Sequence, residues 1–140
     1  MLTEIQEGKA LNSVVKHITQ EKINLYAEAS GDFNPIHIDE SFAAKTPLGG
    51  TIAHGMLNLA YVSEMMTLAF GRSWLSEGKL RAKFKEPARP GDTLTINGKI
   101  GCVEQKDGVS YANCSFECRN QKGEMIVTGE TTVKFSGDKE

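Results

Sequence analysis

Two side chains that can exchange protons lie five positions apart in a short segment that contains proline. Asp32 and His37 frame the sequence Asp-Phe-Asn-Pro-Ile-His. Pro35 fixes its own φ and favours an extended conformation at Asn34, so a fixed bend can bring the carboxylate and the imidazole together. The Asn34 side chain can bond the backbone or Asp32 and so hold the pair in register. Such a pair can share one water and move a proton at a neighbouring carbon, as the addition of water to an activated double bond requires.

A donor for negative charge is the second requirement of that chemistry, because a proton transfer next to a thioester carbonyl leaves charge on its oxygen. The segment Gly-Thr-Ile-Ala-His-Gly-Met at residues 50–56 leads into a long apolar run. A helix that begins there exposes unpaired N–H groups and the positive end of its dipole. Gly55 allows close approach to that backbone, so its N–H is the expected oxyanion donor.

The elements that must position these groups follow from local signals. Residues 13–18 predict a strand, and Thr19 can then cap a helix that carries an apolar stripe at Ile23, Tyr26 and Ala27. Gly31 stands where a left-handed residue ends such a helix, so Asp32 lies just beyond a helix end. Asp39 or Ser41 can cap a second, short helix over residues 42–45, which we expect to form a flap on the ligand side.

The rest of the chain predicts one buried helix and a sheet. Residues 53–70 are apolar almost all round, which is typical of a helix buried on most faces and about 27 Å long. Alternating residues from Leu80 and three runs at 93–101, 109–119 and 125–135 predict four strands. One strand, helices and four further strands indicate an α+β fold, a five-stranded antiparallel sheet wrapped around the central helix, which is the hot-dog architecture.

Composition narrows the class of protein. A chain of 140 residues with a net charge of -2 fits one domain over residues 1–140 and gives no positive field for nucleic acid or an anionic membrane. Cys102, Cys114 and Cys118 have no metal-ligand spacing and are expected to be free thiols in a reducing compartment. With neither a signal peptide nor a membrane span in the sequence, we expect a soluble, cytoplasmic protein.

The chemistry-bearing segments resemble a known family. Those segments are residues 30–37, Ala43 and residues 50–57. They are similar to the signature of the (R)-specific enoyl-CoA hydratases, the MaoC-like or hydratase-2 branch of the hot-dog superfamily. The resemblance implies Asp32 and His37 as the catalytic pair and the Gly55 N–H as oxyanion donor, with Ser63 lining the same site. It also implies a homodimer with joined sheets, an acyl-CoA or acyl-carrier-protein thioester as substrate, and no metal or redox cofactor.

Several alternatives remain open at this stage. Asn34, Ala53 and His54 are further candidates for the substrate site, although His54 at a helix start equally suits capping or packing. The activity could be hydration of an enoyl-CoA or dehydration of a carrier-bound (3R)-hydroxyacyl chain. A hot-dog thioesterase or a non-catalytic acyl-thioester binding module fits the sequence less well, because both Asp32 and His37 are present. The sequence does not assign the first proton transfer to either residue of the pair.

Four cationic side chains lie along the predicted strand that includes Leu80. Lys79, Arg81, Lys83 and Lys85 occur at two-residue spacing and so share one sheet face. A solvated face is one interpretation. The other is a contact with the phosphates of coenzyme A or with an acidic carrier protein.

Overall fold

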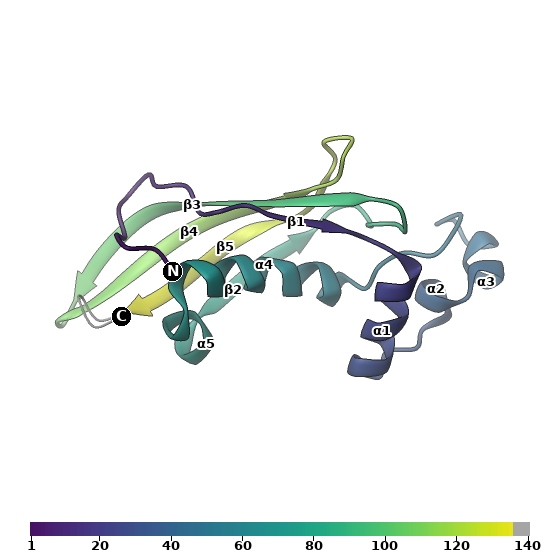
Figure 1. Cartoon of the computed structure of the whole chain (residues 1–140), viewed down its shortest axis with the longest axis horizontal. Coiled ribbons are helices and arrows are strands. Elements are labelled where there is room, and N and C mark those ends of the chain that lie inside the picture. Colours follow the sequence, from purple (N-terminus) through teal and green to yellow (C-terminus); the bar gives the residue numbers. More distant parts are fainter. Residues whose placement is uncertain (136–140) are drawn as a thin grey trace.

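Five antiparallel strands form one sheet, and a long helix lies along one face of it (Figure 1). The structure is a computed structural model that describes residues 1–135. The strands are β1 (Val14–His17), β2 (Lys79–Phe84), β3 (Thr93–Lys106), β4 (Val109–Arg119) and β5 (Met125–Phe135). The helices are α1 (Gln20–Ser30), α2 (Pro35–Ile38), α3 (Glu40–Ala44), α4 (Gly55–Phe70) and α5 (Arg72–Glu77). The α+β architecture expected from the sequence is confirmed.

The strand order is β1-β3-β4-β5-β2, so β1 and β2 are the two edges of the sheet. The register places Ile96, Cys118, Val127 and Phe84 in one row across the four strands from β3 to β2. Ile96, Cys118 and Val127 are buried in the core with residues of α4, so this row faces the helix. Because side chains alternate along a strand, the intervening residues face outward. Lys79, Arg81 and Lys83 of β2 lie on that outward face, and Lys85 follows the strand directly; all four are exposed.

The central helix α4 is buried on one side only, which corrects the expectation that it is buried on most faces. Its buried residues are Leu57, Asn58, Val62, Met65, Met66, Ala69 and Phe70. Met56 is 59% exposed and Leu68 is 53% exposed. A single sheet covers one side of a helix and leaves the other side free, so an apolar sequence all round does not by itself require burial all round.

Helix α4 has a different group of helices at each end. Helices α1, α2 and α3 gather beyond its N-terminal end, and α5 folds back at its C-terminal end (Figure 1). The sequence predicted neither α2 nor α5, because four and six residues are too few to show a helical period. No helix within residues 1–135 has the length and apolar character needed to cross a bilayer.

Local signals set several boundaries as expected. Gly31 ends α1 with φ of 80°, and its N–H donates to the Ala27 carbonyl. The Asp39 side chain caps α3. Strand β3 runs past the predicted end at Gly101, because an irregularity between Ile100 and Cys102 lets it stay paired with β4.

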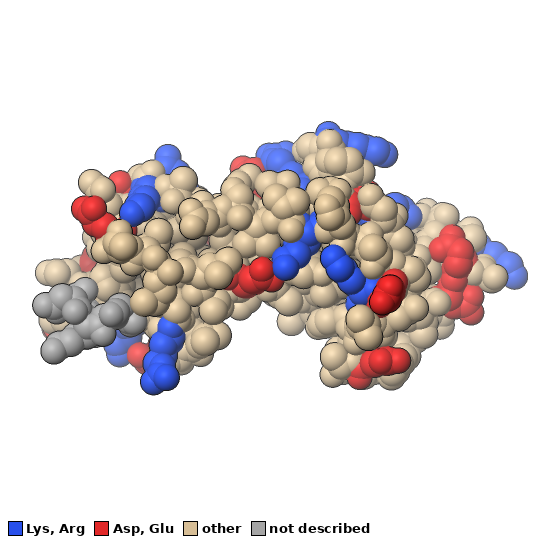
Figure 2. Space-filling model, viewed as in Figure 1, with Lys and Arg blue, Asp and Glu red and all other residues tan. Residues whose placement is uncertain are grey.

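Acidic and basic side chains are interspersed on the face in Figure 2, which shows no large area of one sign.

Candidate active site

The Asp32 segment folds into a fixed bend through side-chain hydrogen bonds to the backbone. An Asp32 carboxylate oxygen accepts from the Asn34 N–H at 3.2 Å, and the Asn34 side-chain oxygen accepts from the Ile36 N–H at 3.1 Å. Asn34 is therefore the N-cap of α2, with Pro35 at the first helical position, which needs no N–H. These bonds confirm that Asn34 holds the bend between Asp32 and His37.

His37 is held in one tautomer by a backbone carbonyl. Its Nδ1 lies 2.8 Å from the Ile52 carbonyl oxygen. Because a carbonyl can only accept, Nδ1 carries the proton and the neutral ring keeps a free lone pair on Nε2. The imidazole is only 7% exposed, so burial and this bond together orient Nε2 as the nitrogen that can take or give a proton.

The structure brings Asp32, His37 and His54 together. One polar side-chain atom from each of the three lies within 4.8 Å of the others. Asp32 is exposed at the surface while the two imidazoles are buried. A carboxylate open to water beside a buried imidazole of fixed tautomer is an arrangement that can move protons.

Three such residues can also suggest a metal site, but the two rings are stacked. The His37 and His54 centroids are 3.9 Å apart with an interplanar angle of 26°. A ring nitrogen binds a metal at about 2.0–2.1 Å within its own ring plane. Nearly parallel rings at this separation direct their lone pairs side by side and not onto one ion. The geometry therefore suits proton transfer better than metal binding.

His54 makes one hydrogen bond and leaves one nitrogen unpaired. Its Nε2 donates to the Asp32 backbone carbonyl at 3.0 Å, and its buried Nδ1 has no partner within the described residues. Asn58, one turn further along α4, has a buried side-chain oxygen that also lacks a hydrogen-bond partner within the described residues. A neutral hydrogen bond contributes about 0.5–1.5 kcal/mol, whereas a buried unpaired polar group costs about 1–3 kcal/mol. On this balance, His54 adds little to stability through hydrogen bonding.

The start of α4 offers free donors at the same place. The N–H groups of Gly55 and Met56 donate to no acceptor within residues 1–135. A Cβ added to Gly55 would lie 3.0 Å from Cε1 of Phe84, so an aromatic ring from β2 covers this helix end. Unpaired N–H groups at a helix N-terminus, next to a proton-transferring pair, can hold a developing oxyanion.

Two other predicted residues have structural partners. Ala53 is buried, and its N–H donates to the Ala88 carbonyl at 2.7 Å, which keeps it out of the helix, so that α4 begins at Gly55 and not at residue 53. Ser63 Oγ accepts from Trp74 Nε1 at 2.9 Å. At about 1.5 Å per residue, Ser63 lies about 12 Å along α4 from Gly55.

Sequence reasoning did not find the residues that support the pair. Gln20 donates to the His37 backbone carbonyl at 2.7 Å and accepts from the Thr51 hydroxyl at 2.7 Å. The Thr51 N–H donates to a Glu40 carboxylate oxygen at 3.2 Å, and the hydroxyl proton is shared between Gln20 and that same oxygen, which lies 3.1 Å away. This network joins α1, α2 and α3 to the extended segment that carries Ile52. Polar side chains spread over 31 positions give no local sequence signal of such a contact.

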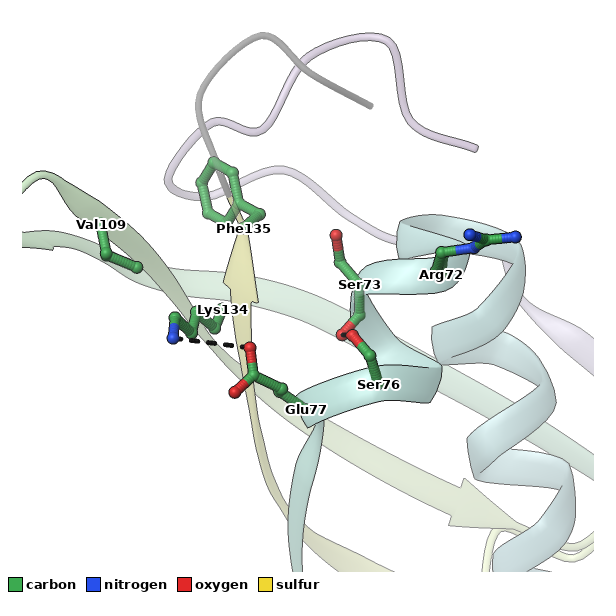
Figure 3. Close-up of a pocket in the computed structure, with 7 residues that line it drawn as sticks. All are labelled: Arg72, Ser73, Ser76, Glu77, Val109, Lys134 and Phe135. Atoms are coloured by element: carbon green, nitrogen blue, oxygen red, sulfur yellow. Dashed lines mark hydrogen bonds and ion pairs between the residues drawn. The ribbon is translucent and has the colours of Figure 1, made fainter.

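The pocket in Figure 3 lies elsewhere in the molecule. It encloses about 270 Å³ between α5 and the ends of β4 and β5, and a Glu77–Lys134 ion pair of 3.5 Å spans part of it. Its lining includes none of the candidate active-site residues described in this section. Because α5 follows the C-terminal end of α4, this pocket is at the opposite end of the helix from Gly55.

Comparisons with known proteins agree with the fold. Residues 4–114 match the family profile described as MaoC like domain. The chain is 33% identical over 132 residues to an (R)-specific enoyl-CoA hydratase of Rhodospirillum rubrum, covering 93% of this chain and 88% of the relative. It is 35% identical over 124 residues to 3-hydroxyacyl-thioester dehydratase Z of Mycobacterium tuberculosis, covering 86% and 73%. The solved R-hydratase PhaJ1 of Pseudomonas aeruginosa superposes with a TM-score of 0.81 at 27% identity, covering 93% and 81%.

Proposed function

Because the chain belongs to the MaoC-like domain family, we propose that it is an (R)-specific enoyl-CoA hydratase, which adds water reversibly to a trans-2-enoyl thioester. One observation carries the proposal. The Asp32 carboxylate and a His37 ring nitrogen lie within 4.8 Å of each other. His54 contacts both Asp32 and His37, and the free N–H groups of α4 start at the next residue. One hydrogen-bonded water can bridge groups up to about 5.5 Å apart.

The proposed reaction uses these groups in two roles. A water held between Asp32 and His37 forms the new C–O bond at C3 while the pair takes its proton, and the pair returns a proton to C2. Charge that develops on the thioester oxygen is held by the N–H of Gly55. Dehydration of the (3R)-hydroxyacyl thioester is the same path in reverse. Asp32 and His37 act as one coupled acid and base.

The direct test is hydration of crotonyl-CoA by the wild type and by two isosteric variants. Asp32→Asn and His37→Gln are each expected to lower kcat by about 100- to 10,000-fold, the usual range for loss of an acid or base. Circular dichroism should show an unchanged fold. His17→Gln is the matched control, because His17 is an exposed imidazole at the end of β1 that bonds Thr93 and does not belong to the Asp32, His37 and His54 group. Substantial hydratase activity in either site variant would contradict the assignment.

The carrier of the acyl chain is a second question within the same chemistry. The relative named 3-hydroxyacyl-thioester dehydratase Z keeps open the alternative of a (3R)-hydroxyacyl-ACP dehydratase. Rates on crotonyl-CoA and on the same chain attached to an acyl carrier protein separate the two. Release of a free thiol, with no hydration, would instead indicate a thioesterase.

The proposal also includes a homodimer in the cytoplasm that needs no metal or redox cofactor. The edge strand β2 pairs with no strand on its outer side in the described chain, which supports a joined sheet between two copies. The three cysteines are free thiols, as the sequence predicted, which supports a reducing compartment. Sedimentation equilibrium tests the dimer, and activity after dialysis against a chelator tests independence from metal.

A further inference from the structure

The geometry points to His54 as a positioning residue that fixes Asp32 relative to His37. This inference rests on the proposed function and deepens it. The imidazole comes from the N-cap of α4, Asp32 comes from the segment after α1, and His37 comes from α2. One ring from the body of the fold therefore contacts both members of the pair.

The contacts of His54 are of two kinds. Its Nε2–H donates to the Asp32 backbone carbonyl at 3.0 Å. Its ring stacks on the His37 ring with centroids 3.9 Å apart, while the Tyr26 ring lies at 4.8 Å and 58°. The hydrogen bond fixes the backbone of Asp32, and the stack limits the tilt of His37. Together they set the separation of the carboxylate and the imidazole.

Capping does not account for this residue. His54 is the N-cap of α4, but its side chain makes no capping hydrogen bond. Packing alone does not account for it either, because an apolar side chain could occupy this position without a buried, unpaired Nδ1. Direct contact with substrate is also disfavoured. The side chain is 2% exposed, one nitrogen is bonded and the other is buried.

Asp32 depends on this link because its other hydrogen bonds are local. Its N–H donates to Ser30 Oγ, and its carboxylate accepts from the Asn34 N–H, both only two positions away. The bond from His54 spans 22 positions and ties the segment to α4. Without it, the exposed Asp32 segment can shift relative to the buried His37.

Two variants separate the effect of the His54 hydrogen bond from the effect of its ring stacking. His54→Phe keeps an aromatic ring and removes the donor, whereas His54→Gln keeps an N–H donor and removes the ring. A misplacement of about 1 Å can lower a rate by about 100-fold, so we expect His54→Phe to lower kcat on crotonyl-CoA by about that factor. KM should stay within about twofold, as for a group that acts on the transition state alone. His54→Gln should recover part of kcat, and His17→Phe should change nothing.

Thermal unfolding decides between positioning and simple support of the fold. The unfolding midpoint of His54→Phe should stay close to that of the wild type, because removal of a buried unpaired nitrogen offsets the lost hydrogen bond and the larger ring. A wild-type kcat in His54→Phe would overturn the inference. An unfolding midpoint so low that unfolding explains the lost activity would also overturn the inference. A rise in KM at unchanged kcat would overturn it as well.

An imidazole ¹⁵N spectrum tests the link without any activity. At mildly alkaline pH the wild type should show His54 as the Nε2–H tautomer and His37 as the Nδ1–H tautomer, with the His54 signals assigned from their loss in His54→Phe. A His54 ring that carries its proton on Nδ1 would overturn the inference. If the wild type does not hydrate crotonyl-CoA, the proposed function fails, while this spectrum still decides whether His54 ties Asp32.

Discussion

Replacing Gly55 with alanine separates the helix N-terminus from the acid and base. A Cβ on Gly55 would lie 3.0 Å from Cε1 and 3.2 Å from Cδ1 of Phe84. Carbon atoms pack at about 3.5–4.0 Å, so the ring must move by about half an ångström. It can do so because Phe84 is 54% exposed at the end of the edge strand β2.

The substitution should leave stability nearly unchanged. Gly55 does not have a positive φ, so alanine can adopt its backbone conformation. Alanine is better than glycine within a helix by about 0.5–1 kcal/mol. The displaced Phe84 ring offsets part of this gain, so we expect an unfolding midpoint close to that of the wild type.

Catalysis should fall sharply in the same variant. We expect the new methyl group, next to the free N–H groups of Gly55 and Met56, to keep a thioester oxygen from reaching them. Loss of one oxyanion donor costs about 2.7–4 kcal/mol, which is about 100- to 1,000-fold in kcat. The assay is the loss of ultraviolet absorbance as the conjugated enoyl thioester of crotonyl-CoA is hydrated.

A double variant identifies the cause of the loss. If Gly55→Ala acts by displacing the aromatic ring, then adding Phe84→Leu should restore the rate. If it acts by blocking the donors, the double variant should remain as slow as Gly55→Ala. Wild-type kcat/KM in Gly55→Ala, with the fold intact, would refute the role given to this helix end.

Three further predictions concern other parts of the chain. Ser63→Ala removes the acceptor of Trp74 Nε1 and should lower the free energy of unfolding by about 1–3 kcal/mol, measured by urea denaturation and tryptophan fluorescence; a lower kcat at unchanged stability would instead place Ser63 in the site. Burial raises the pKa of Cys118 from 9.0 to about 12, so between these values the unfolded chain loses a proton that the folded chain keeps, and stability falls as pH rises. That slope should be smaller in Cys118→Ala, and an equal slope would show that the thiol does not contribute. Charge reversal at the exposed Lys83 and Lys85 should raise KM for crotonyl-CoA at low salt, and an unchanged KM would leave this face as a solvated surface.

The local parts of the site could be predicted from sequence because their signals are local. Gly31 ends α1 in a left-handed conformation, and Asn34 with Pro35 forms the bend after Asp32, as expected. Strands β4 and β5 have the predicted bounds, since the turn at residues 107–108 separates β3 from β4 and the segment at residues 120–123 separates β4 from β5. In each case a few neighbouring residues determine the conformation.

The remaining features depend on contacts between distant segments. The tautomer of His37 is set by the Ile52 carbonyl, and the orientation of His54 by the Asp32 carbonyl, neither of which is a side-chain property. Phe84 reaches Gly55 only because β2 returns beside β5. The apolar sequence of α4 predicted burial on most faces, yet Met56 is exposed, because one sheet covers only one side of the helix.

The stereochemistry of hydration tests the central claim most directly. Wild-type protein is incubated with crotonyl-CoA, the product thioester is hydrolysed, and the 3-hydroxybutyrate is separated on a chiral column. Water that adds from the face carrying Asp32 and His37, with the thioester oxygen on Gly55, should give the (3R) product alone. An (S) product, or no hydration by a folded protein, would contradict the account.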